Sequence, residues 1–351
     1  MLSNLEHPEN RSASSPANDA PLVDVTLITY NHERFVARAI EGVLSQQTRF
    51  SVHLIIGDDC SSDNTQDIIK KYAADCDQPV TLLLDQEHRG LMDPGRVGIR
   101  ALTLGQAKYI ALLDGDDYWT SQRKLQKQVE FLESHPDFAI CFHNALMFFE
   151  DGSQPSRNLL ATEQKAVSTF EDLLETNFIP TSTTLIRRSA LPTLPSWLFE
   201  LSVADWPLYV LIAEQGKIGY LDEVMANYRV HQKGAWSSGT ELNRATEVIT
   251  MFEHLDRHFD YKYQRKIRLT KAEWYYLLSE TACSSGDLLS SQRYFRNYVD
   301  CEGSVLQRRI GSLVLRAYLP RLYRLLKAVR DRLRPASRGP VVTKRLGERL
   351  S

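Results

Sequence analysis

The sequence has few of the features that mark a specialised class of protein. It holds only five cysteines in 351 residues, without a Cys-x-x-Cys pair, which argues against a disulfide framework or structural zinc site and is typical of a reducing cytosol. It has no run of about 18 apolar residues, so we expect no membrane span. A formal net charge of −2 gives no general reason to expect a nucleic-acid partner. We therefore expect an ordinary soluble, cytoplasmic globular protein, whose function must be sought in local motifs.

The two ends of the chain differ from its middle. Residues 1–20 are rich in Ser, Asn, Pro and Ala and lack a basic start followed by an apolar run, so we expect a disordered leader and not a signal peptide. Residues 21–240 carry the strand-like segments, and from residue 241 to 351 the patterns are helix-like. The sequence predicts one main domain followed by a helical C-terminal region.

Strand-like and helix-like segments alternate in the main domain. Buried strands are predicted at residues 23–29, 51–57, 80–84 and 108–113. Helical spacing between them implies a mainly parallel sheet that is covered by helices on both faces, which is the α/β class. Ligands of such sheets bind beyond the carboxyl ends of the strands.

Acidic residues crowd together at those strand ends. Asp58 and Asp59 follow the second strand, and Asp114, Asp116 and Asp117 follow the fourth. Like charges repel, and each carboxylate loses hydration when it is buried, so the tip is either solvated or binds a cation. A solvated turn is the common explanation of a lone Asp-x-Asp. A second acid pair after another strand favours Mg²⁺ or Mn²⁺, held together with a di- or triphosphate.

Six segments of the chain resemble the family 2 glycosyltransferases of GT-A fold. They are VTLITYNHERFVARAIEGVLSQ, LIIGDDCSSDNTQDII, YIALLDGDDYW, TSTTLIRRSAL, ADWPLYVLIAEQGKIGYLDEVMANYRVH and KGAWS. Each motif is weak alone, but their order is specific, and together they cover residues 23–238. The resemblance implies a Rossmann-like sheet flanked by helices, a nucleotide-sugar donor and a divalent metal.

The resemblance also implies a donor-binding surface. Thr29 and Tyr30 would cradle the nucleotide base, and Asp59 would hydrogen-bond to it. Arg229 and His231, in the segment YRVH, would lie near the diphosphate. A purely structural histidine is the alternative for His231.

The remaining acids receive catalytic and metal-binding roles from the same resemblance. Asp116 would be the main metal ligand, Asp114 would contact the nucleoside or the metal shell, and Asp117 would shape the donor or acceptor pocket. Asp205 matches the catalytic base. Because Asp205 precedes an apolar helix-like run, a plain helix N-cap is the alternative.

Two positions depart from the family pattern. Ala204 stands where family members often carry Glu before the base, which puts acceptor contacts or tuning of the base in doubt. Arg96 precedes Gly98 where Asn is usual, and it could pair with a phosphate or with the acid loop. A solvated or salt-bridged arginine is the alternative for Arg96.

These features predict an inverting glycosyltransferase. It would move a sugar from a nucleotide-sugar, UDP-linked by resemblance, to a hydroxyl of a glycan or lipid-linked acceptor in cell-surface polysaccharide synthesis. A nucleotidyltransferase is disfavoured because the sequence lacks a glycine-rich phosphate loop followed by Lys. A non-catalytic nucleotide-sugar-binding or scaffold protein of the same fold is the alternative, and Ala204 is the feature that favours it.

The C-terminal tail is strongly basic. Residues 308–349 carry thirteen Lys and Arg residues, opposed only by Asp331 and Glu348. One predicted helical face is apolar and is formed by Leu322, Leu325, Leu326, Val329 and Leu333. Such a helix either lies on an anionic membrane surface or packs on the protein with a solvated basic face.

Overall fold

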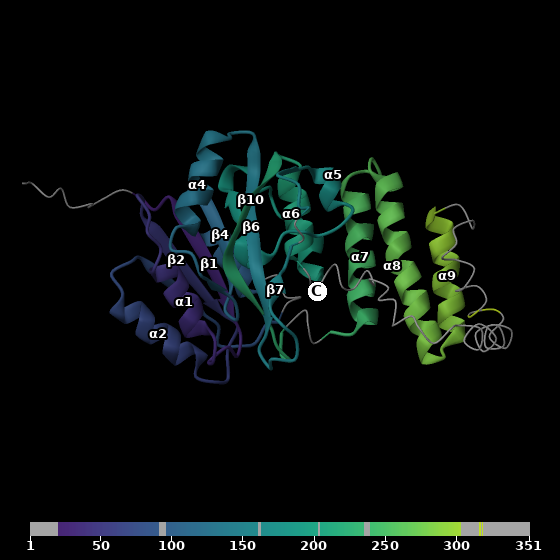
Figure 1. Ribbon diagram of the computed structural model, residues 1–351, viewed down its shortest axis with the longest axis horizontal. Helices are drawn as coiled ribbons and strands as arrows, with labels where there is room; N and C mark the ends of the chain where they lie inside the picture. Colours follow the sequence, from purple (N-terminus) through teal and green to yellow (C-terminus); the bar gives the residue numbers. More distant parts are fainter. Residues whose placement is uncertain are drawn as a thin grey trace, which may run out of the picture.

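The computed structural model describes residues 20–90, 96–160, 163–202, 204–234 and 239–302, together with residues 316 and 318 (Figure 1). A central sheet with helices on both sides is followed by three helices that stand side by side. The predicted leader, except for residue 20, and most of the basic tail lie outside the described residues. So does most of the KGAWS segment.

The sheet is mixed. Its strands are β1 (Val23–Thr29), β2 (Val52–Asp58), β3 (Val80–Leu84), β4 (Tyr109–Asp114), β5 (Tyr118–Trp119), β6 (Phe138–Phe149), β7 (Arg157–Asn158), β8 (Val167–Ser168), β9 (Leu185–Arg187) and β10 (Lys217–Val230). The main order is β3-β2-β1-β4-β9-β6-β10-β5, with β7 beside β6 and β8 beside β10. The half from β3 to β4 is wholly parallel, as predicted. The short β9 is antiparallel to both β4 and β6, which sequence periodicity did not predict.

Helices cover the sheet and continue beyond it. They are α1 (Val36–Leu44), α2 (Thr65–Asp75), α3 (Val97–Leu104), α4 (Lys124–Ser134), α5 (Phe170–Leu173), α6 (Asp205–Ala213), α7 (Glu241–His258), α8 (Gln264–Ser285) and α9 (Leu288–Glu302). Three short 3₁₀ segments, η1 (Thr181–Thr183), η2 (Arg188–Ala190) and η3 (Ser196–Glu200), lie between α5 and α6. The α/β class predicted from the sequence is therefore confirmed.

The register of the parallel strands brings the predicted acids to one edge. Ile28 pairs with Asp114, and Thr29 pairs with Asp58. Strand β1 is buried along nearly its whole length because it lies between β2 and β4 and packs against α1. Since parallel strands end at the same edge, the loops after β1, β2 and β4 meet there.

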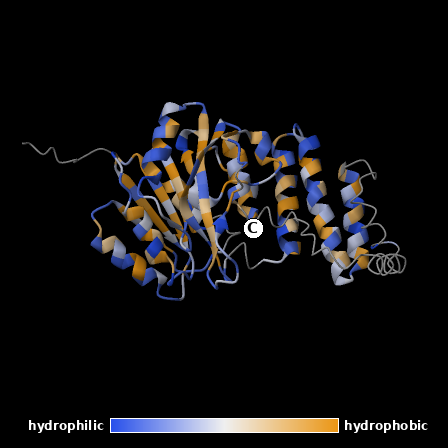
Figure 2. Ribbon diagram, viewed as in Figure 1, coloured by the Kyte–Doolittle hydropathy of each residue, from blue (hydrophilic) through white to orange (hydrophobic). Residues whose placement is uncertain are grey.

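Helix α6 links the sheet to the C-terminal helices. Every residue from Trp206 to Ala213 is buried, which is expected for a helix that is packed on all sides. Its apolar residues share one core with Val248 and Phe252 of α7 and with Leu278 of α8. Figure 2 shows hydrophobic and hydrophilic residues alternating along α7, α8 and α9, as in helices that bury one face. Helices α7 and α8 thus extend the core of the sheet domain.

No helix among the described residues is long and apolar enough to cross a membrane.

Candidate active site

The acid loop is the turn after β4, and glycine is required in it. The backbone N–H of Gly115 donates to the carbonyl of Ile28 at 2.8 Å, which pulls the turn against the end of β1. A Cβ on Gly115 would lie 2.7 Å from the side chain of Thr29 and 3.0 Å from Nδ1 of His32. The Asp-Gly-Asp sequence therefore lets two acids approach the loop that follows β1.

The three acids of this loop differ in their protonation. Desolvation, together with the charges of Asp116 and Asp205, raises the pKa of Asp114 to about 8. Burial and the charges of Asp116 and Asp114 also raise the pKa of Asp117 well above its usual value. For Asp116 burial acts in the same direction, but a hydrogen bond from His231 and the charges of His32 and His231 outweigh it and lower the pKa. Asp116 is therefore the acid of this loop that is ionised most readily.

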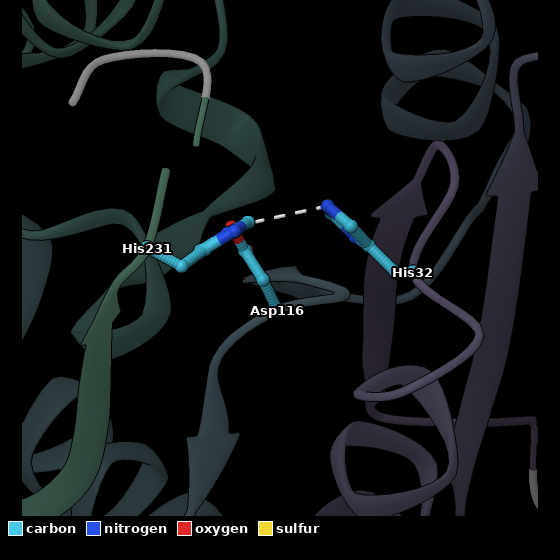
Figure 3. Close-up of side chains that lie close together, drawn as sticks. All are labelled: His32, Asp116 and His231. Carbon is cyan, nitrogen blue, oxygen red and sulfur yellow. Dashed lines mark hydrogen bonds and ion pairs between the residues drawn. The ribbon is translucent and has the colours of Figure 1, made fainter. Parts of the chain in front are cut away.

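Two histidines lower the pKa of Asp116. Nε2 of His231, which directly follows β10, lies 2.9 Å from Oδ2 of Asp116. Nε2 of His32, in the loop after β1, lies 3.9 Å from the same oxygen. Figure 3 shows the two imidazoles approaching Asp116 from opposite sides. Among the described residues these three side chains form the one group whose ligand atoms could hold a metal ion, all within 4.8 Å of one another.

The residues present fit a divalent cation. One carboxylate and two imidazoles are ordinary ligands of first-row divalent ions. Asp116, the predicted main metal ligand, belongs to this group, and the structure adds His231 and His32 to the candidate ligands. That Asp116 binds a metal stays a prediction. The sequence also predicted Asp114 as a ligand. It is the last residue of β4, and its own pKa responds to the charge of Asp116, so the two carboxyl groups are close.

Arg229 holds the acid loop in place. Its backbone N–H donates to Oδ1 of Asp117 at 2.9 Å, and its Nε donates to the carbonyl of Asp116 at 2.8 Å. Its Nη1 bonds to the carboxylate of Glu150, and its guanidinium carbon lies 4.3 Å from the ring centre of Phe35. The sequence predicted a place near the diphosphate for Arg229. The described contacts show Arg229 bracing the loop that carries the acids, and its place near the diphosphate stays a prediction.

Asp205 begins α6 and faces the same site. Its Oδ1 accepts from the backbone N–H of Trp206 at 2.7 Å, and Thr181 Oγ1 lies 3.5 Å from its Oδ2. Burial raises its pKa in spite of these bonds. Its charge is also one of the causes that raise the pKa of Asp114. A local helix-start contact is thus present, and the role of Asp205 as the base stays a prediction.

The part of the site that is predicted to bind the nucleotide base contains two stacked aromatic rings. Tyr30 is 40% exposed, and its ring stacks on that of His88 with ring centres 4.3 Å apart. Asp59 is buried beneath, and its carboxylate accepts from the backbone N–H groups of Arg89 and Gly90 at 2.8 and 2.9 Å. Nδ1 of His88 lies 2.9 Å from Asp59 Oδ2. Asp59 therefore fixes the loop after β3, and Tyr30 offers the exposed aromatic surface.

Thr29 and Asp58 pair with each other at the ends of β1 and β2. Thr29 is buried, and its hydroxyl finds no hydrogen-bond partner among the described residues. Asp58 accepts from the backbone N–H of Ser61 at 2.9 Å, so it caps the turn after β2. The predicted contact of Thr29 with a nucleotide stays a prediction.

Arg96 is placed differently from the expectation. Its guanidinium is buried and donates to the backbone carbonyls of Leu201 at 2.9 Å and Leu198 at 3.3 Å. It therefore ties the start of α3 to the segment around η3, and these described contacts involve neither the acid loop nor solvent. Sequence reasoning could not predict this, because backbone carbonyls as partners leave no residue-type signal.

Two histidines of the site were missed in the sequence. His32 directly follows the Thr-Tyr-Asn stretch that carried the resemblance, so its place in a ligand-binding loop was the available signal. His88 lies two residues before Gly90, which has a positive φ of 71°. Only its stacking on Tyr30 shows that it belongs to the site.

Part of the chain matches a known protein family. Residues 24–194 match the family model described as glycosyl transferase family 2. The resemblance read from the motifs is thereby confirmed over these residues.

Curated relatives agree with that class. An uncharacterized protein of Mycobacterium tuberculosis (strain ATCC 25618 / H37Rv) is 36% identical over 221 residues, which cover 62% of this chain and 61% of that protein. The match thus spans less than two thirds of that relative. TuaG of Bacillus subtilis, whose name assigns it as a glycosyltransferase to teichuronic acid biosynthesis, is 27% identical over 246 residues, covering 69% of this chain and 92% of TuaG.

Solved structures share the fold. TarS 1–349 of S. aureus in complex with UDP aligns with a TM-score of 0.51 and 16% identity, covering 92% of this chain and 94% of that one. The mannosyltransferase PcManGT from Pyrobaculum calidifontis, in complex with GDP-Man and Mn²⁺, aligns with a TM-score of 0.51 and 17% identity, covering 89% and 88%. At these identities the likeness shows the fold alone, and it confirms the GT-A architecture.

Proposed function

We propose that this chain is an inverting, metal-dependent glycosyltransferase. It would transfer a sugar from a nucleotide-sugar donor, UDP-linked, to a hydroxyl of a glycan or lipid-linked acceptor in cell-surface polysaccharide synthesis. One observation carries the proposal. His231, which follows β10, lies 2.9 Å from the carboxylate of Asp116, and the charges of Asp116 and of Asp205, at the start of α6, both raise the pKa of Asp114 at the end of β4.

Asp205 is the proposed base. An acceptor hydroxyl is a poor nucleophile until a carboxylate takes its proton. As Asp205 accepts that proton, the hydroxyl oxygen bonds to the anomeric carbon of the donor sugar. The bond from that carbon to the diphosphate oxygen breaks, and its electron pair leaves with the nucleoside diphosphate. Attack from the face opposite the leaving group inverts the anomeric centre.

The raised pKa of Asp205 suits this role. A carboxylate with a pKa nearer to neutral is a stronger base than an exposed one, provided that it is still ionised at the working pH. The leaving diphosphate gains negative charge in the same step. A divalent cation at Asp116 would supply the opposing positive charge. Arg229 would hold the backbone carbonyl of Asp116 and the carboxyl group of Asp117 in position while this happens.

The donor and acceptor classes are supported by relatives. TarS binds UDP, and PcManGT binds GDP-Man with Mn²⁺, so proteins of this fold accept nucleoside diphosphates. TuaG is named for teichuronic acid biosynthesis, which supports a surface polysaccharide as the product. In this chain Tyr30 would stack on the base, in a site bounded by His88 and Asp59.

Membrane contact through residues 308–349 is a separate part of the proposal. These residues lie outside the described part of the chain, apart from residues 316 and 318, so their basic composition is the support. The protein would then act at the cytoplasmic face of the membrane. Cosedimentation with anionic lipid vesicles should be lost after truncation at Leu319. Equal binding by the truncated and full chains would exclude this contact.

Nucleotide binding tests the donor site. Thermal unfolding would be followed with UDP, GDP, CDP or dTDP, each with Mn²⁺, Mg²⁺ or a chelator, for the wild type and Asp116→Ala. We expect one nucleotide to raise Tm by several degrees only when metal is present, because saturating ligand adds ~2–3 kcal/mol. The shift should vanish in Asp116→Ala and persist in Asp67→Ala, an exposed acid on α2. No shift with any nucleotide would count against a donor site.

A further inference from the structure

His32, Asp116 and His231 come from three distant parts of the chain. His32 follows β1, Asp116 follows β4, and His231 follows β10. Their side chains are only 16%, 17% and 8% exposed, so all three are largely withdrawn from water. Two imidazoles thus lie on either side of the carboxylate of Asp116 (Figure 3).

The spacing of the ligand atoms is near that of a metal site. Ligands about 2.1 Å from one ion are about 3–3.5 Å apart from each other. His231 Nε2 and Asp116 Oδ2 are already 2.9 Å apart. His32 Nε2 lies 3.9 Å from the same oxygen, so a shift of less than about 1 Å would complete the set.

The backbone of the β1–α1 loop aims His32 at this point. Asn31 adopts a left-handed conformation with φ of 54°, which Asn tolerates better than most residues. Its side-chain oxygen accepts from the N–H of Ser62 at 2.8 Å, and the N–H of His32 donates to Thr65 Oγ1 at 2.9 Å. These bonds pin the loop to the segment after β2. His32 is therefore held by the fold at the edge of the site, and it is not a loose surface histidine.

A neighbouring ring fixes the imidazoles as well. Phe35 packs edge-on against His231 with ring centres 5.0 Å apart and lies 6.1 Å from the ring of His32. Gly115 leaves the space that the ring of His32 occupies. Both rings are thus placed by packing before any ligand arrives, which lowers the cost of binding.

We propose that His32 is a third protein ligand of the cation, and that the resulting His–Asp–His set selects a first-row transition ion such as Mn²⁺ over Mg²⁺. Imidazole nitrogen suits first-row transition ions such as Fe²⁺ and Zn²⁺, and Mn²⁺ is the weakest-binding member of that series, whereas Mg²⁺ prefers oxygen ligands in near-octahedral geometry. This inference rests on the proposed function, in that the ion is the one that would serve the diphosphate.

Direct detection of metal–nitrogen bonds tests the inference. Mn²⁺ would be titrated into the full chain, with and without UDP, and free Mn²⁺ followed by its electron paramagnetic resonance signal. Pulsed measurements of ¹⁴N coupling then count the imidazoles bound to Mn²⁺. We expect two imidazoles in the wild type, and one in His32→Ala with affinity at least about tenfold lower, since losing even an outer partner of a metal costs about 10–100-fold.

A second variant and a control sharpen the test. His32→Gln offers a carbonyl oxygen in place of the ring nitrogen, so the preference for Mn²⁺ over Mg²⁺ should narrow while some binding persists. His135→Asn removes a histidine at the end of α4, before the amino end of β6, and should change neither affinity nor ¹⁴N coupling.

The outcomes separate this inference from the proposed function. If Mn²⁺ binds the wild type with a single imidazole and His32→Ala is unchanged, His32 is not a ligand, and the metal-dependent transferase still stands. If the wild type binds no Mn²⁺ in either condition, both proposals fail together. Equal affinities of the wild type for Mn²⁺ and Mg²⁺ would overturn the selectivity.

Discussion

Acids are buried at both edges of the sheet, but the two edges differ in how many positively charged partners those acids have. At the amino edge, Asp24 at the start of β1 is 1% exposed and fully compensated. Its carboxylate lies 2.7 Å from Nη2 of Arg188 and 2.9 Å from Nδ1 of His53, and it accepts from the N–H of Ala107 at 2.8 Å. At the carboxyl edge, three acids within four residues share too few positive partners.

That difference separates structural acids from functional ones. When a buried charge has its full set of partners, removing it destabilises the fold, and the charge is not available to a ligand. Acids that lack such partners have raised pKa values, as Asp114 and Asp117 do, and such clusters occur preferentially at functional sites. A bound cation would supply the positive charge that the acids at the carboxyl edge lack.

The largest expected effect is on turnover. Asp205→Asn should lower kcat by about 10²–10⁴-fold, because the acceptor proton loses its base while the fold is kept. Sugar transfer measured with the donor identified by nucleotide binding checks this. Asp67→Asn removes an acid from the first turn of α2 and is the matched control. Wild-type turnover by Asp205→Asn would reduce Asp205 to a helix-start acid.

The second-largest effect is expected at the amino edge of the sheet. It concerns the stability of the fold and not nucleotide binding. Asp24→Ala leaves Arg188 and His53 without their shared partner, so unfolding free energy should fall by about 3–5 kcal/mol. Urea unfolding measures the loss. Asp137→Ala breaks an exposed pair with Lys217 and should change little. If Asp24→Ala kept full stability but lost nucleotide binding, the contrast between the two edges would collapse.

A smaller effect of opposite sign is expected at the carboxyl edge. Because the pKa of Asp114 rises from 3.8 to about 8 on folding, its proton stabilises the fold at low pH, and that contribution is lost as pH rises through about 8. Asp114→Asn should therefore stabilise the metal-free protein by about 1–3 kcal/mol at pH 8 and hardly at all at pH 4. Thermal unfolding of both proteins between pH 4 and pH 8 measures this difference in stability. If Asp114→Asn were less stable than the wild type at pH 8, the prediction would be wrong.

The smallest effect concerns the aromatic surface. Tyr30→Ala should weaken binding of the nucleotide by about 5–20-fold, since stacking on a base is worth about 1–2 kcal/mol. Tyr30→Phe keeps the ring and should bind nearly as well as the wild type. Isothermal titration calorimetry measures the affinity of both variants for the nucleotide. Unchanged affinity in Tyr30→Ala would move the base away from the stack of Tyr30 and His88.

Much of the parallel half of the sheet could be predicted from the sequence. β1 and β3 have the predicted bounds, and β2 and β4 are shifted by one residue, because continuous apolar runs ending in turn residues are a local signal. β9 could not be predicted as an antiparallel strand between β4 and β6. Its three residues are too few to show a period, and its partners are far away in the chain.

The candidate site divides in the same way. Asp114, Asp116 and Asp59 could be predicted because each acid follows a strand whose end is visible locally. The partners of Arg96 and Arg229 could not, because a guanidinium finds carbonyls and carboxylates wherever the packed chain brings them. The division of the chain near residue 240 stays a prediction. Strand β10 ends at Val230 and α7 begins at Glu241, but α7 shares the core of the sheet domain.

The sequence by itself determined that acids would collect at one edge of a parallel sheet, because strand ends and turn residues are encoded by neighbours along the chain. Only the tertiary structure decided that His32 and His231 would meet across Asp116. Their approach depends on strand order and on the packing of Phe35, neither of which any short stretch of residues specifies.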